Sequence, residues 1–192
     1  MDEAVLRQQL CQAAQQLWMR GLVAGDGGLL SVECHRRRYL VTPAGIRRSN
    51  LQSGEPFVID VGGVSLNGEA DIDPCHWLPH RLAYQNETVD IAGQRPITIR
   101  ATIAATPPMV MALIRVRPGG QALELPSAIT VPVVAPDDQP LLRAALKTAP
   151  VVALVSAGVI SVAADLPSAL SAIERVEHAA TIEIACDHHG QP

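Results

Sequence analysis

Aromatic side chains are scarce in this sequence: Phe, Trp and Tyr together make up 3% of the 192 residues, and there is one Phe. Surfaces that bind single-stranded nucleic acid stack bases on aromatic rings, so this scarcity argues against such a surface. Positive charge is also in deficit, because the formal net charge at pH 7 is −4. A chain of this charge has no broad electrostatic attraction to a phosphate backbone. We therefore expect no nucleic-acid partner.

Long apolar runs and paired cysteine motifs are also missing. No stretch approaches the roughly 18 apolar residues that predict a membrane span, and the N-terminus lacks the basic-then-apolar order of a signal peptide. The cysteines show no Cys-x-x-Cys pair, which fits reduced thiols better than disulfides or a cysteine-rich zinc site. They are Cys11, Cys34, Cys75 and Cys186. We expect a cytoplasmic protein with no membrane partner.

What the sequence does contain is aliphatic residues in quantity. Hydrophobic residues make up 48% of the chain and charged residues 18%. This is enough apolar surface for one sizeable core, built from Val, Leu, Ile, Ala and Met. A typical length of about 100 to 200 residues per domain favours one domain over residues 1–192. We expect a flexible tail from about residue 186.

Residue patterns predict alternating helices and strands. Helical periodicity, the caps Asp2 and Asp73 and the helix start at Asp137-Asp138 predict helices over about residues 3–20, 73–85, 107–114, 137–148 and from 165 onward. Alternating or aliphatic runs predict strands over about residues 29–34, 39–42, 57–61, 64–66, 97–103, 128–134, 151–155 and 159–163. Pro79 is expected to restrict the start of the second helix or to kink it. Because several strands form hairpins and helices follow throughout, we expect a three-layer αβα sandwich.

Three segments resemble a known family. They run from Gly21 to Ser31 (Gly-Leu-Val-Ala-Gly-Asp-Gly-Gly-Leu-Leu-Ser), from Leu40 to Ile46 (Leu-Val-Thr-Pro-Ala-Gly-Ile), and from His76 to Tyr84 (His-Trp-Leu-Pro-His-Arg-Leu-Ala-Tyr). Together they resemble the class II aldolase/adducin family. The resemblance implies an α/β fold with a mainly antiparallel central sheet. It also implies a homo-oligomer, because that family builds its sites between the subunits of a tetramer.

The same resemblance implies a zinc site that this chain does not match. The family holds a catalytic Zn²⁺ with a His-x-His pair from a strand and one His from an Asn-His-Gly turn, and the metal stabilises an enediolate. The matching positions here are Ile103, Ala105 and Ala157. All six histidines lie outside residues 81–177, so no shift of one or two residues restores the ligands. We expect no zinc cofactor.

The phosphate-binding positions that the resemblance implies are altered as well. They correspond to Leu29, Ala44, Pro74 and Cys75. A buried phosphate without hydrogen-bond partners would cost several kcal/mol of desolvation, so tight phosphate binding is not expected. The backbone N–H groups of Gly27, Gly28 and Gly45 remain candidates for holding a weaker anionic ligand.

His76 stands where the resembled family places its acidic proton-transfer residue, four positions before a histidine. An imidazole can serve as an acid or a base, so His76 is the candidate catalytic residue. The alternative is a polar helix residue that faces solvent or a subunit contact. His80 and Tyr84 match family positions with structural roles.

Two histidine pairs are weak candidates for a metal site elsewhere. His76 and His80 lie four residues apart, the spacing of two ligands on one helical face. The alternatives are a pair of ordinary surface histidines or a helix whose geometry is broken near Pro79. His188 and His189 are adjacent near the C-terminus, where a solvated tail is the alternative to metal binding.

Arginines cluster in the segments that precede and follow the second expected strand. They are Arg36, Arg37 and Arg38, followed by Arg47 and Arg48. Either a basic patch for a small anion or a solvated hairpin turn explains them.

These patterns leave two functions open. In the first, the chain is a degenerate class II aldolase-like protein that has lost zinc-dependent aldol cleavage. It would then serve in small-molecule binding, scaffolding or regulation as a homo-oligomer. In the second, it is a divergent lyase or isomerase on a small carbonyl or sugar compound, with His76 as acid or base and with no metal or a relocated metal site. The first is favoured, because apolar residues stand at all three zinc positions.

Overall fold

The computed structural model describes residues 2–66, 68, 72–116 and 121–189, the last three of these by their backbone alone. The helices are α1 (Glu3–Met19), α2 (Pro74–Asn86), α3 (Pro108–Val116), α4 (Gln139–Thr148) and α5 (Leu166–His189). The strands are β1 (Leu29–His35), β2 (Arg38–Val41), β3 (Phe57–Asp60), β4 (Thr88–Val89), β5 (Ile97–Thr98), β6 (Ala101–Ala105), β7 (Leu123–Leu125), β8 (Ile129–Val131), β9 (Val133–Val134), β10 (Val151–Leu154) and β11 (Gly158–Ala163).

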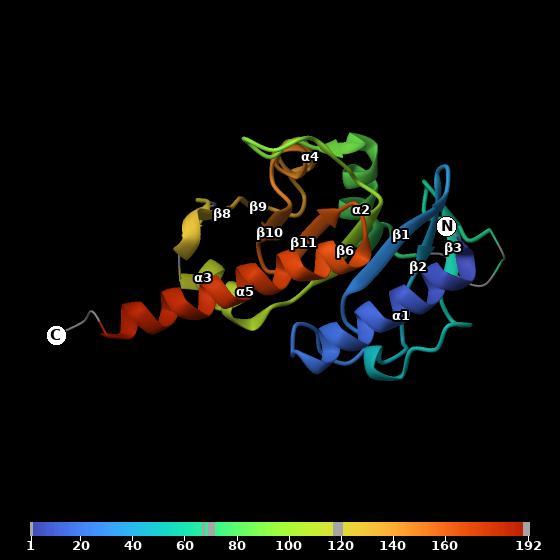
Figure 1. Cartoon of the computed structure of the whole chain (residues 1–192), viewed down its shortest axis with the longest axis horizontal. Helices are drawn as coiled ribbons and strands as arrows, with labels where there is room; N and C mark the ends of the chain where they lie inside the picture. Colours follow the sequence, from blue (N-terminus) through green and yellow to red (C-terminus); the bar gives the residue numbers. More distant parts are fainter. Residues whose placement is uncertain (1, 67, 69–71, 117–120, 190–192) are drawn as a thin grey trace.

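A seven-stranded sheet forms the middle layer, in the order β3-β2-β1-β6-β11-β10-β9 (Figure 1). Strands β9 and β10 run parallel, and the other neighbouring strands of this sheet run antiparallel. The pairs β4–β5 and β7–β8 form two small ladders of their own. The predicted αβα sandwich with a mainly antiparallel sheet is therefore confirmed.

The two faces of the sheet carry separate apolar clusters, because successive strand residues point to opposite sides. On one face Leu30 and Ile103 belong to the cluster that contains residues of α1, α3 and α5. On the other face Tyr39 and Ile160 belong to the cluster that contains residues of α2 and α4. Every helix therefore covers one of the two faces of a single sheet.

Helix starts follow the predicted caps. The side chains of Asp2, Asp73 and Asp138 each accept a hydrogen bond from a backbone N–H in the first turn of α1, α2 and α4. Helix α2 runs from Pro74 to Asn86 through Pro79, which is buried. Pro79 is the sixth residue of the helix, so it removes the hydrogen bond that would run to the Cys75 carbonyl in the first turn.

Two predicted strands are divided in the structure. The run 97–103 splits, because β5 pairs with β4 whereas β6 joins the central sheet between β1 and β11. The run 128–134 splits at Pro132 into β8 and β9. Proline has no N–H to donate to a ladder, which explains this break. Strand β7 was not predicted, and the expected strand over 64–66 is reduced to a bridge between Ile59 and Ser65.

Helix α5 begins close to the predicted position and runs to His189, so the described part of the expected tail, residues 186–189, has a helical backbone. The C-terminal end of α5 projects away from the sheet and from α2 (Figure 1). In the described part of the chain, no helix has both the length and the apolar character needed to cross a bilayer.

Candidate functional site

Of the three positions that correspond to zinc ligands in the resembled family, Ala105 and Ala157 lie at one end of the central sheet and Ile103 lies in the middle of β6. Val159 lies opposite Ala105 in the β6–β11 ladder, and Ala157 precedes Val159 by two residues in the β10–β11 turn. Ile103 and Ala105 are 0% and 2% exposed and pack in the core on the side of α1 and α5. None of the three side chains offers a nitrogen, oxygen or sulfur atom. The residues present do not fit a zinc ion.

The glycine turn before β1 and the loop after β2 lie side by side at the same end of the sheet. Gly28 has a φ of +77°, and a Cβ there would come within 2.8 Å of the Ala104 carbonyl oxygen and of the Val23 side chain. Only glycine fits so close to the neighbouring backbone. The turn therefore has its shape for packing reasons.

Two of the three backbone N–H groups that we considered for anion binding donate within the chain. The Gly27 N–H donates to the Ala24 carbonyl at 2.8 Å. The Gly45 N–H donates to Oδ2 of Asp26 at 3.0 Å. An anion that approached Gly45 would meet the Asp26 carboxylate already in place. This contact is unfavourable for a second negative charge.

Arg48 is buried between these two loops, and the sequence analysis missed its role. It is 2% exposed. Its guanidinium donates to four backbone carbonyls, those of Gly27 at 3.1 Å, Gly28 at 2.6 Å, Pro43 at 2.8 Å and Ile46 at 3.2 Å. Burial lowers the pKa of Arg48, and the nearby Asp26 carboxylate opposes that shift.

The five-arginine patch considered from the sequence is therefore wrong as a single unit. Arg36, Arg37 and Arg38 lie at the exposed end of the β1–β2 hairpin, whereas Arg48 ties the loops at the opposite end of β1. An arginine before a loop gives no sequence signal of burial, because its partners are backbone carbonyls that any residues could supply.

His76 and His80 have different surroundings although they are one helical turn apart. His76 is exposed near the start of α2. His80 is 0% exposed, and its Nδ1 lies 2.7 Å from Oγ of Ser31 in β1. Its ring stacks on Trp77 with centroids 5.6 Å apart. The pair therefore does not present two free imidazoles on one surface.

His80 belongs to a buried polar network with Ser31 and Tyr84. Oγ of Ser31 lies 2.8 Å from the Tyr84 hydroxyl as well as against His80. Burial, together with the neighbouring His76, lowers the pKa of His80 to about 3. Burial also raises the pKa of Tyr84. Both side chains are neutral near pH 7, so the network holds α2 against β1 and fits the structural roles expected for His80 and Tyr84.

The weak metal candidates are not brought together within one chain. The end of α5 that carries His188 and His189 projects away from α2, which carries His76 and His80 (Figure 1). Among the described residues, no group of three or more His, Cys, Asp and Glu side chains is arranged to hold a metal ion. The side chains of His188 and His189 lie outside the described part.

Comparison with known proteins gives the same fold. The model of the class II aldolase and adducin N-terminal domain matches residues 8–184. Among solved structures, YgbL from Klebsiella pneumoniae is 21% identical with a TM-score of 0.75, over 96% of this chain and 91% of that one. An L-fuculose 1-phosphate aldolase is 24% identical with a TM-score of 0.73, over 97% and 88%. The L-fuculose-1-phosphate aldolase from Thermus thermophilus is 19% identical with a TM-score of 0.77, over 97% of both chains. No curated protein sequence matches the chain.

Proposed function

Because the chain belongs to the class II aldolase and adducin N-terminal domain family, we propose that it keeps that family's fold without its zinc-dependent aldol cleavage, and acts as a homo-oligomeric small-molecule-binding protein. One observation carries the proposal. The positions of the three zinc ligands hold Ile103, Ala105 and Ala157, and two of these side chains are packed in the core. A Lewis acid cannot be held by side chains without donor atoms.

The loops that would hold a substrate phosphate support the same conclusion. The Asp26 carboxylate accepts a hydrogen bond from the Gly45 N–H, and the Arg48 guanidinium donates hydrogen bonds to four backbone carbonyls. Hydrogen bonds from these two charged side chains thus hold the two loops together. A phosphate would have to displace a carboxylate and would gain no free cation from Arg48.

Zinc stoichiometry tests the proposal. The purified protein is equilibrated with zinc, passed through a desalting column and measured by inductively coupled plasma mass spectrometry. A variant with His188→Ala and His189→Ala is measured in parallel, because adjacent histidines near the terminus bind transition metals by themselves. We expect less than about 0.1 zinc per chain in this variant, since a site without ligands retains no metal. One zinc per chain in the variant would overturn the proposal.

The oligomeric part rests on exposed apolar side chains on α1 and α3. Met19 is 67% exposed and Val116 is 71% exposed, and Trp18 on α1 and Met109 on α3 are 44% and 37% exposed. Exposed apolar side chains that gather in one patch mark surfaces that bind other proteins. Light scattering at micromolar concentration checks this part. A measured mass equal to that of one chain, 20.4 kDa, would exclude the proposed homo-oligomer.

A second candidate function has one supporting observation, the accessibility of His76. Its imidazole is exposed, while His80 on the next turn is buried and fixed by Ser31. An accessible imidazole can remove a proton next to a carbonyl without a metal. Incorporation of solvent deuterium into small hydroxycarbonyl compounds, followed by NMR, tests this. Exchange that His76→Gln abolishes and the matched variant His178→Gln retains would favour the enzyme, and equal rates in both would exclude His76.

A further inference from the structure

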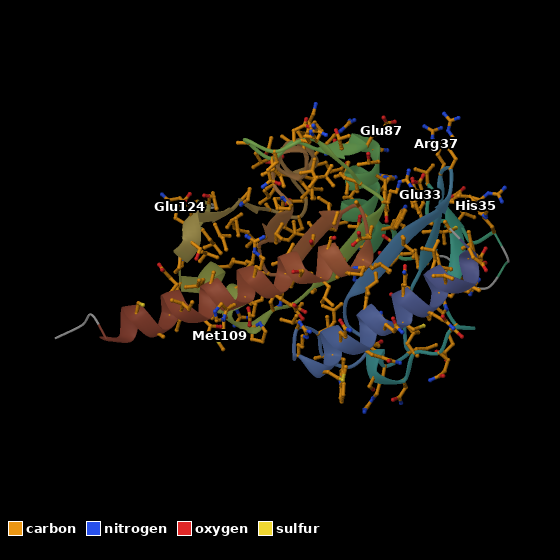
Figure 2. The ribbon with its side chains drawn as sticks, viewed as in Figure 1. Glu33, His35, Arg37, Glu87, Met109 and Glu124 are labelled. Carbon is orange, nitrogen blue, oxygen red and sulfur yellow. The ribbon has the colours of Figure 1, made fainter. Side chains whose placement is uncertain are left out.

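A cleft of about 420 Å³ lies at the end of the sheet opposite the aldolase positions. It is formed by the β1–β2 hairpin, the C-terminal end of α2, strand β5 and helix α4. Glu33, Arg37 and Glu87 lie close together there (Figure 2). The phosphate positions Pro74 and Cys75 and the candidate His76 lie at the start of α2. Tyr84 and Glu87, which line the cleft, follow His76 by eight residues or more, which is about 12 Å along a helix. The cleft is therefore distinct from the zinc and phosphate positions.

The floor of the cleft is aromatic and aliphatic. Tyr39 and Tyr84 stack with ring centroids 4.2 Å apart and an interplanar angle of 29°. Both line the cleft, together with Val61 and Ile99. A chain with 3% aromatic residues thus places two of its rings, in contact, under one opening. A flat or apolar group would find favourable contacts there.

The rim of the cleft is rich in guanidinium groups. Arg36 and Arg37 come from the hairpin and Arg143 comes from α4. Among the described residues, none of these three arginines forms an ion pair, although Glu33 and Glu87 line the same cleft. Three guanidinium groups against two carboxylates give a local excess of positive charge on a chain of net charge −4. Such a local excess attracts anions.

Two rim residues have strained backbones. Arg37 and Glu87 have φ values of +60° and +61°, in the left-handed region that favours glycine. At Arg37, glycine would satisfy the hairpin turn with less strain, so the turn itself gives no reason for an arginine. At Glu87 the positive φ accompanies the end of α2, where its N–H donates to the Tyr84 carbonyl, so Arg37 is the rim position at which strain suggests a role in binding.

We propose that this cleft binds a small organic anion with a flat or apolar body, such as an aromatic carboxylate or a phosphate monoester. Arg36, Arg37 and Arg143 hold the anionic group by charge-assisted hydrogen bonds. The body of the ligand lies over Tyr39 and Tyr84. The site is independent of the loss of zinc chemistry, so either proposal can fail without the other.

Calorimetric titration of the full chain with phenyl phosphate and with benzoate, at low salt, tests the site. Inorganic phosphate tests the contribution of the ring, and benzylamine tests the sign of the charge. We expect saturable binding of both aromatic anions with a Kd of about 0.1–1 mM, weaker binding of inorganic phosphate and no binding of benzylamine. Absence of saturation by both aromatic anions up to about 10 mM, or equal binding of benzylamine, would overturn the proposal.

Variants separate binding from folding. Arg37→Gly removes a guanidinium and relieves the left-handed strain, so it should weaken phenyl phosphate binding about tenfold while the melting temperature stays equal or rises. Arg143→Gln should weaken binding similarly, and Arg37→Lys should weaken it less. Arg47→Gln removes an exposed positive charge outside the cleft and should bind like the parent. Unchanged affinity in both Arg37→Gly and Arg143→Gln would contradict the assignment.

Discussion

Oδ2 of Asp26 accepts a hydrogen bond from the backbone N–H of Gly45 at 3.0 Å, which joins the glycine turn before β1 to the loop after β2. A carboxylate thus occupies a backbone donor that the sequence left as a candidate for a weaker anionic ligand. Arg48 is buried between the two loops and donates hydrogen bonds to backbone carbonyls of both. Together Asp26 and Arg48 tie the two loops to each other through hydrogen bonds within the chain.

Removing the Asp26 carboxylate should reopen the Gly45 N–H to anions. In Asp26→Ala we expect the Gly45 amide resonance to shift on titration with inorganic phosphate, because its hydrogen bond becomes free and one negative charge is lost. In the parent protein the same resonance should not shift. Two-dimensional NMR of labelled protein measures both. A phosphate-dependent shift of Gly45 in the parent would show that Asp26 does not close the site.

Arg48→Met should destabilise the fold by about 2–4 kcal/mol, because four carbonyls lose a charged donor. The measurement is urea unfolding at pH 7. Arg47→Met is the matched control, since its exposed neighbouring side chain should change the free energy of unfolding by no more than about 0.5 kcal/mol. Equal stabilities of the two variants would mean that the buried guanidinium contributes nothing net.

Much of the fold follows from local sequence, as the hairpin of β1 and β2 and the caps Asp2, Asp73 and Asp138 illustrate. These features depend on neighbouring residues and were predicted. The division of residues 97–103 was not, because it depends on which distant strand each half pairs with. The Ile99 N–H donates to Glu87, and the Arg100 N–H donates to Ala163. Periodicity carries no information about such partners.

The site was predictable only in part, for a related physical reason. The replacement of zinc ligands by Ile103 and Ala105 is visible in the sequence. The different burial of His76 and His80 is not, because helical spacing gives the direction of a side chain but not the extent of the element that covers it. The interior position of Arg48 and the cleft over Tyr39 and Tyr84 arise from contacts between segments far apart in the chain.

His80 should make stability depend on pH. Its pKa is lowered to about 3 in the folded chain, against about 6.5 when unfolded. The unfolded chain therefore binds more protons between these values, so stability is retained above pH 6.5 and falls as the pH drops towards 3. His76, Tyr84 and Tyr39 are the titratable groups near the ring or its network.

His80→Gln keeps a hydrogen-bonding partner for Ser31 but does not titrate. Between pH 7 and pH 4, the free energy of unfolding of the parent should fall by about 3 kcal/mol more than that of this variant. Urea unfolding at a series of pH values provides the comparison. If the free energies of unfolding of the two proteins change in parallel with pH, His80 is more exposed to solvent than it is in the structure.

Gly158 should be intolerant of a side chain, unlike Gly45. A Cβ at Gly158 would lie 2.2 Å from the Ala105 carbonyl oxygen, whereas nothing lies within 4 Å of one at Gly45. Both have positive φ. We expect Gly45→Ala to cost about 1 kcal/mol and Gly158→Ala to cost at least about 3 kcal/mol, because only the latter forces two strands apart. Similar melting temperatures would contradict this account of the β10–β11 turn.

The central claim, that this chain has the aldolase fold without zinc-dependent aldol cleavage, is tested most directly by one rate. The measurement is retro-aldol cleavage of sugar 1-phosphates by the purified protein with zinc supplied, repeated after chelation and after zinc is restored. With Ile103, Ala105 and Ala157 at the ligand positions, we expect no cleavage above the uncatalysed rate in any of the three conditions. Turnover that chelation abolishes and zinc restores would contradict the account.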